Sequence, residues 1–383
     1  MDREQTAFQQ KTQKHQQKLM RSAYNRSGLS VAALYGVISV VSAVLIGFLV
    51  GAQVFRIVTA SMSGDADAFS AGSLLEDTGL MSTVLVMSAL GAGIGFAAAI
   101  PLMRKITSYK THVPILRQDL SFPAFLVIVL SAFGLWGVGV YLGNFAELLG
   151  IPVRGTDIAE FASPWAQIVM LVYTVLGAPV VEELVFRKTL LDVLHPYGQT
   201  CAATVTALLF GLIHGNSGQF FLAFFLGLLF AAVYQKTGRV VYTIALHFII
   251  NLTASVPDIL KFAGIDAEEI FTFYVLPVLT LAGLTAVVIS FVRKAEWTRL
   301  TPPDVPDANR AMFRNPGMLI CVIGGLVTAA STDFAMILLI AYYGKTPLPF
   351  VGLLSTALMI AVTVFVCVLG GRILRKRDIP DAG

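Results

Sequence analysis

Four ionisable side chains lie within or at the edge of long apolar runs: Glu182, Glu183, His214 and His247. One charged side chain at the centre of a bilayer costs roughly 2.5–3.5 kcal/mol on insertion scales, so such residues usually face a bundle interior and serve a function. All four come from one stretch of the chain. The pattern predicts a single polar site inside a protein embedded in lipid.

The spacing around the two glutamates predicts different tasks for them. Residues four apart lie on one face of a helix, so Glu183 and Arg187 are expected to form a supporting ion pair. Glu182 lies about 100° around the helix and lacks that partner. A carboxylate without a partner in apolar surroundings suits general acid–base chemistry. On this motif alone, the alternative that both glutamates only lock a helix junction stays open.

Each histidine has a helical neighbour. Phe210 lies one turn before His214 and is expected to wall the pocket. His247 and Asn251 are four apart, so both project from one face, where they could bind a metal, orient a water or stabilise an oxyanion. Taken singly, each histidine could instead cap a helix or make a helix–helix contact. Together with the glutamates, they provide what hydrolysis requires: a base, a polarising group and an oxyanion donor.

The elements that must carry these residues are apolar helices. Of the 383 residues, 56% are hydrophobic and 13% are charged, whereas a soluble chain carries about 25% charged residues. A bilayer core needs about 20 apolar residues per helix. The predicted fold class is therefore all-α, a polytopic transmembrane bundle of about ten spans. The apolar runs are 30–54, 81–103, 120–148, 163–181, 198–214, 217–236, 239–255, 270–292, 316–343 and 348–374.

The loop charges predict how the bundle is oriented. Cytoplasmic loops carry an excess of Lys and Arg. By this rule both termini are cytoplasmic, and so is a turn that contains Arg187 and Lys188. The pattern, together with the lack of an organelle signal, favours a multi-pass protein of the cell membrane, of the bacterial plasma membrane type. The basic segments are 1–27, 104–119, 236–239 and 293–315, and the acidic loops are 55–80, 149–162 and 256–269.

The sequence divides into four predicted parts. Residues 1–29 form a hydrophilic cytoplasmic tail, and residues 30–295 form an eight-span membrane body whose catalytic core covers about 120–255. Residues 296–315 form a proline-containing cytoplasmic loop. Residues 316–383 form a two-span hairpin with a basic tail.

Helix geometry adds a constraint on the fourth span. A helix over 198–214 would place His214 about 24 Å from its cytoplasmic end, at 1.5 Å per residue. To meet His214, Glu182 must lie equally deep. This predicts one long fourth helix that continues to about Leu194 and carries both glutamates near the middle of the bilayer.

The ordered motifs resemble a known family. They read Glu-Glu-x-x-x-Arg at 182–187, Phe-x-x-x-His at 210–214 and His-x-x-x-Asn at 247–251, on successive helices. This set resembles the CPBP family of intramembrane proteases, which includes CAAX prenyl endopeptidases and bacteriocin-processing or self-immunity relatives. The resemblance covers about 165–251, with every motif position filled. It implies an intramembrane endopeptidase, a hydrolase acting on a membrane-associated peptide or protein, with no nucleic-acid partner.

The resemblance also implies residue roles. Glu182 and His214 would activate water, and His247 and Asn251 would form the oxyanion site. Glu183, Arg187 and Phe210 would support the geometry.

The role of a metal stays open at this stage. The family is commonly labelled metalloprotease, so Glu182, His214 and His247 could hold a divalent metal such as zinc. These residues do not make the His-Glu-x-x-His zinc pattern, however, and a metal-free mechanism is equally open. Two other functions remain as alternatives: a non-catalytic membrane scaffold or bacteriocin immunity protein of the same fold, and a transporter.

Overall fold

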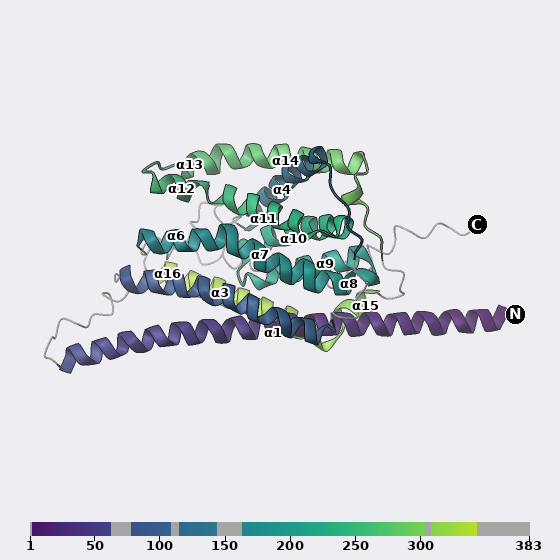
Figure 1. Cartoon of the computed structure of the whole chain (residues 1–383), viewed down its shortest axis with the longest axis horizontal. Helices are drawn as coiled ribbons and strands as arrows, with labels where there is room; N and C mark the ends of the chain where they lie inside the picture. The colour runs from purple at the N-terminus through teal and green to yellow at the C-terminus, as the bar shows by residue number, and fades with distance from the viewer. Residues whose placement is uncertain (1, 63–77, 109–114, 144–162, 303–307, 343–383) are drawn as a thin grey trace.

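The computed structural model describes residues 2–62, 78–108, 115–143, 163–302 and 308–342. Every regular element within these ranges is a helix (Figure 1). The predicted all-α fold class is therefore confirmed, and the predicted run 348–374 lies outside the described residues. The first elements are α1 (Asp2–Met62), α3 (Thr78–Ile106) and α4 (Phe122–Gly143).

A long helical stretch then covers residues 164–197. Most of the remaining helices follow the predicted apolar runs, whereas residues 256–262 and 308–313 form short helices within predicted loops. The remaining helices are α9 (Gln199–Ile213), α10 (Ser217–Thr237), α11 (Val240–Ala254), α12 (Val256–Phe262), α13 (Glu268–Ile270), the π segment η7 (Phe271–Val275), α14 (Leu276–Val292), α15 (Ala308–Phe313) and α16 (Pro316–Tyr342).

Six described helices are long and apolar enough to cross a membrane. A seventh crossing is added if α11 and α12, which are bent by 50° relative to each other, count as one span. The chain is thus a multi-pass membrane protein, and six or seven of the ten predicted spans are supported. The difference lies partly in α9, whose 15 residues extend about 22 Å, less than a hydrocarbon core of about 30 Å.

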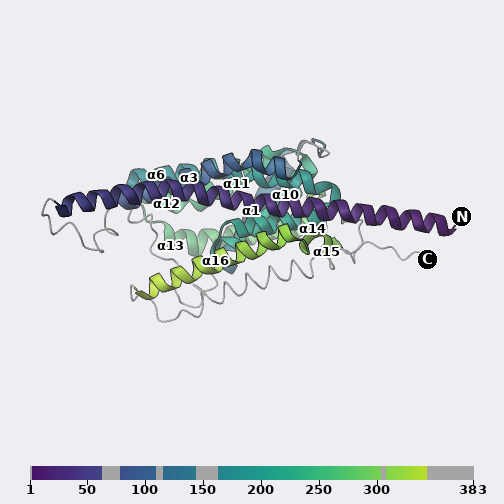
Figure 2. The same cartoon turned by 90° about the horizontal axis from the view of Figure 1, so that it is seen from below.

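The first helix crosses the predicted boundary at residues 29 and 30 without a break. It packs against α3 and α16 (Figure 2). The contact with α16 is close because Gly28 meets Gly317, where a Cβ atom on Gly28 would lie 2.4 Å from the Gly317 carbonyl carbon. Asn25 Oδ1 also accepts a hydrogen bond of 2.7 Å from the Gly317 N–H. The start of the predicted C-terminal hairpin is therefore joined to the body through α1.

Glycines also set the spacing of the central helices. Gly134 of α4 and Gly283 of α14 face each other so closely that a Cβ atom on Gly134 would lie 2.4 Å from the Gly283 backbone. Small residues of this kind let membrane helices approach until their backbones touch. α4 also packs against α10, which lies beside α9 and α11. This arrangement places α10 in the interior of the bundle, next to the helices that carry the candidate site.

The two ends of the bundle carry the segments that the loop charges assign to opposite sides. The N-terminus, α8 (Asp192–Leu194) and α15 lie toward one end, whereas α12 and α13 lie toward the other (Figure 1). This separation matches the predicted alternation of basic and acidic loops.

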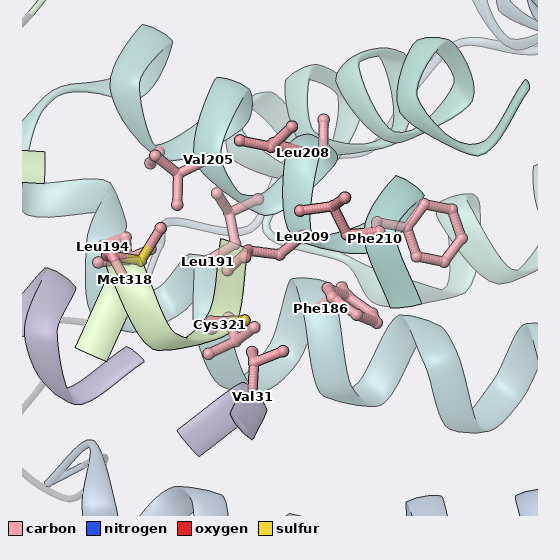
Figure 3. Close-up of a cluster of buried hydrophobic side chains, with 14 of the residues drawn as sticks. Val31, Phe186, Leu191, Leu194, Val205, Leu208, Leu209, Phe210, Met318 and Cys321 are labelled. Carbon is pink, nitrogen blue, oxygen red and sulfur yellow. The ribbon is translucent and has the colours of Figure 1, made fainter. Parts of the chain in front are cut away.

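A large apolar core joins the glutamate-bearing helix to its neighbours. Side chains from α1, from residues 184–194, from α9 and from α16 meet there, and Phe186 and Phe210 lie together at one side of the group (Figure 3). Their ring centroids are 5.0 Å apart in an edge-to-face arrangement. Phe210 thus extends from the apolar core toward the polar site.

Candidate active site

The glutamates lie in an unbroken helical stretch of 34 residues, Pro164–Tyr197. The prediction of one long helix that continues to about Leu194 is confirmed. The prediction that Arg187 and Lys188 form a cytoplasmic turn is wrong, because both residues lie inside this helix. Arg187 is 1% exposed, and its charge serves an internal ion pair rather than orientation in the membrane.

This stretch alternates between α and π geometry. It consists of α6 (Pro164–Val172), η4 (Tyr173–Gly177), α7 (Ala178–Glu183), η5 (Leu184–Leu191), α8 and the short 3₁₀ turn η6 (His195–Tyr197). Segments η4 and η5 are π-helical. Such segments are rare and frequently occur at functional sites. Both glutamates lie at the end of α7, between the two π segments.

Glu182 and His214 lie at similar depths along the bundle. Glu182 lies 15 residues before the helix ends at Tyr197, and His214 follows the 15-residue α9 that begins at Gln199. Each residue is thus about 20 Å from the same end of the bundle.

Glu183 is the buried anion of the site. Its Oε1 atom lies 3.0 Å from Arg187 Nη1 and 3.2 Å from His247 Nδ1, and its side chain has no exposed surface. The ion pair with Arg187 is the one expected from the i, i+4 spacing. The contact with His247 was not predicted from the sequence. It joins the glutamate helix directly to α11.

Arg187 is enclosed by polar and aromatic partners. Its guanidinium carbon lies 4.6 Å from the centroid of the Phe210 ring and 5.3 Å from that of Phe230. Its Nη2 atom donates to the Gly227 carbonyl oxygen over 3.4 Å. A buried cation is tolerated only when it is paired and hydrogen-bonded. Arg187 therefore fixes the side chain of Glu183 in place.

Glu182 occupies a different environment. Its side chain is 12% exposed, and its Oε2 atom lies 3.9 Å from His247 Nε2. That oxygen is buried and makes no hydrogen bond to any described residue. Each ring nitrogen of His247 thus faces one of the two glutamates. The more open carboxylate is the one without a dedicated cation, which is the environment expected for a reacting group.

His214 ends α9 and is oriented by its own helix. Its Nδ1 atom lies 2.7 Å from the Phe210 carbonyl oxygen. Because a carbonyl only accepts, Nδ1 carries a hydrogen and Nε2 is left for another partner. The Phe210 ring stands edge-to-face to both His214 and His247, with centroids 5.1 and 5.9 Å away. His214 is linked to the Glu182–His247 pair through this ring.

Asn251 contacts the helix that carries the two glutamates, at a position before them in the chain. Its Nδ2 atom donates to the Thr174 carbonyl oxygen over 2.8 Å. Thr174 lies within the π segment η4. The Asn251 amide, which the sequence predicts to stabilise an oxyanion, therefore donates at least one N–H group to the backbone of the glutamate helix.

Comparison with known families assigns this part of the chain. Residues 164–253 match the model of a family described as type II CAAX prenyl endopeptidase Rce1-like. This segment of the chain is therefore similar to the CAAX prenyl endopeptidases. The resemblance predicted for about 165–251 is thus confirmed, and the protease family supports a hydrolase. No curated protein and no solved structure matched the chain.

The Rce1-like segment does not carry an evident zinc site. Within the described ranges, no group of three or more His, Cys, Asp or Glu side chains is placed to hold a metal ion. Glu182 Oε2 lies 3.9 Å from His247 Nε2, and His214 packs against the same Phe210 ring as His247. The expected zinc set of Glu182, His214 and His247 is therefore not supported by the arrangement of its donors.

Several residues that contact the candidate site were not predicted from the sequence. Phe230 packs against the ring of His247, with centroids 5.6 Å apart, and also against Arg187. Gly227 supplies a carbonyl to Arg187, and Thr174 supplies one to Asn251. These are apolar or backbone contributions, which a search for polar side chains does not detect. Pro179, three residues before Glu182, is the one local signal of irregular helix geometry.

Proposed function

We propose that the chain is an intramembrane endopeptidase that hydrolyses a peptide bond of a membrane-associated substrate with a water activated by Glu182. The observation that carries this proposal is the Glu182 Oε2 atom, which is buried without a hydrogen-bond partner among the described residues and lies 3.9 Å from His247 Nε2. The neighbouring Glu183 is held by Arg187 and His247. One glutamate is thus free to react, while the other is fixed.

The charge of the cluster suggests how His247 acts. Two ionised glutamates face one arginine, so a second positive charge would balance the group, and buried charges need such balance. A doubly protonated His247 supplies it. Its Nδ1–H donates to Glu183, and its Nε2–H is available to donate to a developing oxyanion.

Each proton transfer in the proposed reaction then has a named donor and acceptor. Glu182 takes a proton from water, and the hydroxide attacks the carbonyl carbon of the scissile bond. The negative charge that develops on the carbonyl oxygen is stabilised by His247. Collapse of the tetrahedral intermediate breaks the C–N bond, and the protonated Glu182 returns its proton to the leaving amine.

His214 has a complementary task in this scheme. Its Nδ1–H is committed to the Phe210 carbonyl, so Nε2 can accept a hydrogen bond from the attacking water. An acceptor in this position orients the water for attack, and orientation of this kind lowers the barrier through proximity. Phe210 keeps the two imidazoles edge-on to one ring and so fixes their relative placement.

We propose further that the protein lies in a bacterial plasma membrane with ten spans and both termini cytoplasmic. Support comes from the loop charges and from the separation of α15 from α12 and α13 toward opposite ends of the bundle (Figure 1). Short tags inserted after Arg117 and after Asp266 test the orientation. The first should be protected from a protease added outside intact cells, and the second should be cleaved.

The hydrolytic proposal is tested with purified protein in liposomes and a panel of membrane-anchored peptides, with and without a prenylated cysteine near the C-terminus. In water enriched in oxygen-18, each cleaved peptide should gain one heavy oxygen in its new carboxyl group. The wild-type protein should produce this product, and the Glu182→Gln variant should not. Equal product from both proteins would contradict the assignment of Glu182.

A further inference from the structure

The side chain of Asn251 is already engaged in the free protein. It lies one turn after His247 on α11, and its Nδ2 atom donates over 2.8 Å to the backbone carbonyl of Thr174. Thr174 is the second residue of the π segment η4. α11 therefore contacts the glutamate helix at two levels, with His247 at the glutamates and Asn251 at the π turn before them.

Backbone pairing explains why the Thr174 carbonyl is left over. In an α-helix, this carbonyl would accept from the N–H of Ala178. Here the Ala178 N–H bonds to the Tyr173 carbonyl instead, the i to i+5 pairing of a π turn. In the π pattern, Thr174 would accept from residue 179, which is Pro179 and has no N–H. Both helical partners are therefore missing.

An unpaired carbonyl within an apolar bundle costs free energy comparable to a lost hydrogen bond. Asn251 replaces the missing donor from a neighbouring helix. Side chains of adjacent helices commonly satisfy backbone groups that a proline frees in a membrane helix. The contact thus has a physical cause in Pro179 and not only in the proximity of α11.

The π turn η4 precedes Glu182 in the same helix and therefore affects the direction in which its side chain points. A π bulge adds one residue to a helical turn, and each added residue rotates everything that follows by about 100° relative to what precedes it. Glu182 follows η4 by five residues. The bulge therefore helps to decide whether this carboxylate faces His247 or another side of the helix.

We propose that Asn251 is a positioning residue that stabilises the π turn opened by Pro179 and thereby aims Glu182 at His247. The catalytic consequence rests on the proposed hydrolytic function, whereas the hydrogen bond that replaces the Pro179 donor does not. This role differs from the oxyanion contact expected from the sequence, because it acts before any substrate binds.

A double-mutant cycle on the substrate-free protein tests the proposal. Pro179→Ala restores an N–H group, so Thr174 gains a backbone partner in either helical register. Asn251→Ala should lower the thermal unfolding midpoint in the wild-type background and should lower it much less in the Pro179→Ala background. Equal shifts in the two backgrounds would overturn the proposal. Leu252→Ala, an exposed neighbour on α11, should give the same small shift in both.

A second variant keeps the test decisive if Pro179→Ala does not fold. Asn251→Leu keeps a side chain of similar size but has no group that can donate to a carbonyl. It should lower the thermal unfolding midpoint. Wild-type stability of Asn251→Leu would rule out the hydrogen bond as a stabilising contact.

The ¹⁵N signals of the His247 imidazole report whether Asn251 positions Glu182, which a stability measurement alone does not show. The chain has five histidines, so ¹⁵N-labelled histidine gives a small set of signals, and His247→Ala identifies the relevant one. Asn251→Ala should shift the Nε2 signal of His247, because Glu182 moves, and should leave that of His195 unchanged. An unshifted His247 signal would overturn the positioning role. These measurements need no substrate, so their failure is distinct from a failure of the proposed hydrolysis.

Discussion

The imidazole of His247 lies 3.9 Å from the Glu182 carboxylate, measured from Nε2 to Oε2, although the two residues are 65 positions apart in the chain. Their side chains come from α11 and from the end of α7. The same imidazole contacts Glu183 through Nδ1. His247 therefore contacts one glutamate that Arg187 fixes and a second that has no such cation, which is the distinction on which the proposed mechanism depends.

The fixed glutamate should be essential for stability. Glu183→Gln leaves Arg187 buried with its ion pair broken, and loss of one partner of a buried pair typically costs about 3–5 kcal/mol. The thermal unfolding midpoint of the purified variant should fall accordingly. The matched control is Asp119→Asn, which breaks the exposed Arg239–Asp119 pair of 2.9 Å and should cost about 0–1 kcal/mol. Similar losses in the two variants would contradict the account.

His214 should be needed for activity and not for folding. Loss of a group that orients or polarises the attacking water commonly lowers the rate by about 10²–10⁴-fold. His214→Ala should show a loss in this range, with normal membrane insertion. His195→Ala is the control, because His195 contacts Gln235 outside the site. If the two histidine variants retained the same activity, His214 would have no part in the reaction.

Removal of divalent metals should leave activity intact. The described residues include no set of three donors placed for a metal ion, and the proposed steps use only Glu182, His214 and His247. Dialysis against a strong chelator, followed by the cleavage assay, measures this directly. Loss of cleavage that zinc alone restores would show that a metal takes part, and the proton path through Glu182 would have to be revised.

The glycine contact between α4 and α14 should be intolerant of a methyl group. Gly134→Ala places a Cβ atom 2.4 Å from the Gly283 backbone, so the helices must separate, and overpacking of this kind costs about 1–3 kcal/mol. Gly36→Ala adds the same methyl group where nothing lies within 4 Å. It should leave stability unchanged or raise it slightly. The unfolding midpoints of the two variants should therefore move apart.

The sequence was sufficient to predict an all-helical membrane protein and the ion pair at the centre of the candidate site. Apolar length alone places the helices, because a bilayer accepts few other structures. The i, i+4 spacing alone predicts the Glu183–Arg187 ion pair. The depth argument from His214 predicts the long glutamate helix, against the simpler interpretation of Arg187 and Lys188 as a turn.

Contacts between helices could not be predicted in the same way. The link from Glu183 to His247 depends on how α11 packs against α7, and one sequence does not specify that packing. In our proposal the π segment η4 depends on Pro179 and on the donor that Asn251 supplies from another helix. Phe230 and Gly227 contribute an apolar face and a backbone carbonyl, and neither differs in the sequence from ordinary residues of a membrane helix.

The most direct test of the central claim compares cells that produce wild-type protein with cells that produce Glu182→Gln at equal membrane levels. The measurement is the abundance of new chain ends among membrane proteins, determined by mass spectrometry. Because Glu182 Oε2 makes no hydrogen bond to a described residue, the substitution should preserve the fold. We expect the termini produced by the wild-type protein to fall to the level of cells that lack the protein. An unchanged set of termini in Glu182→Gln cells would contradict the claim that this carboxylate activates the water.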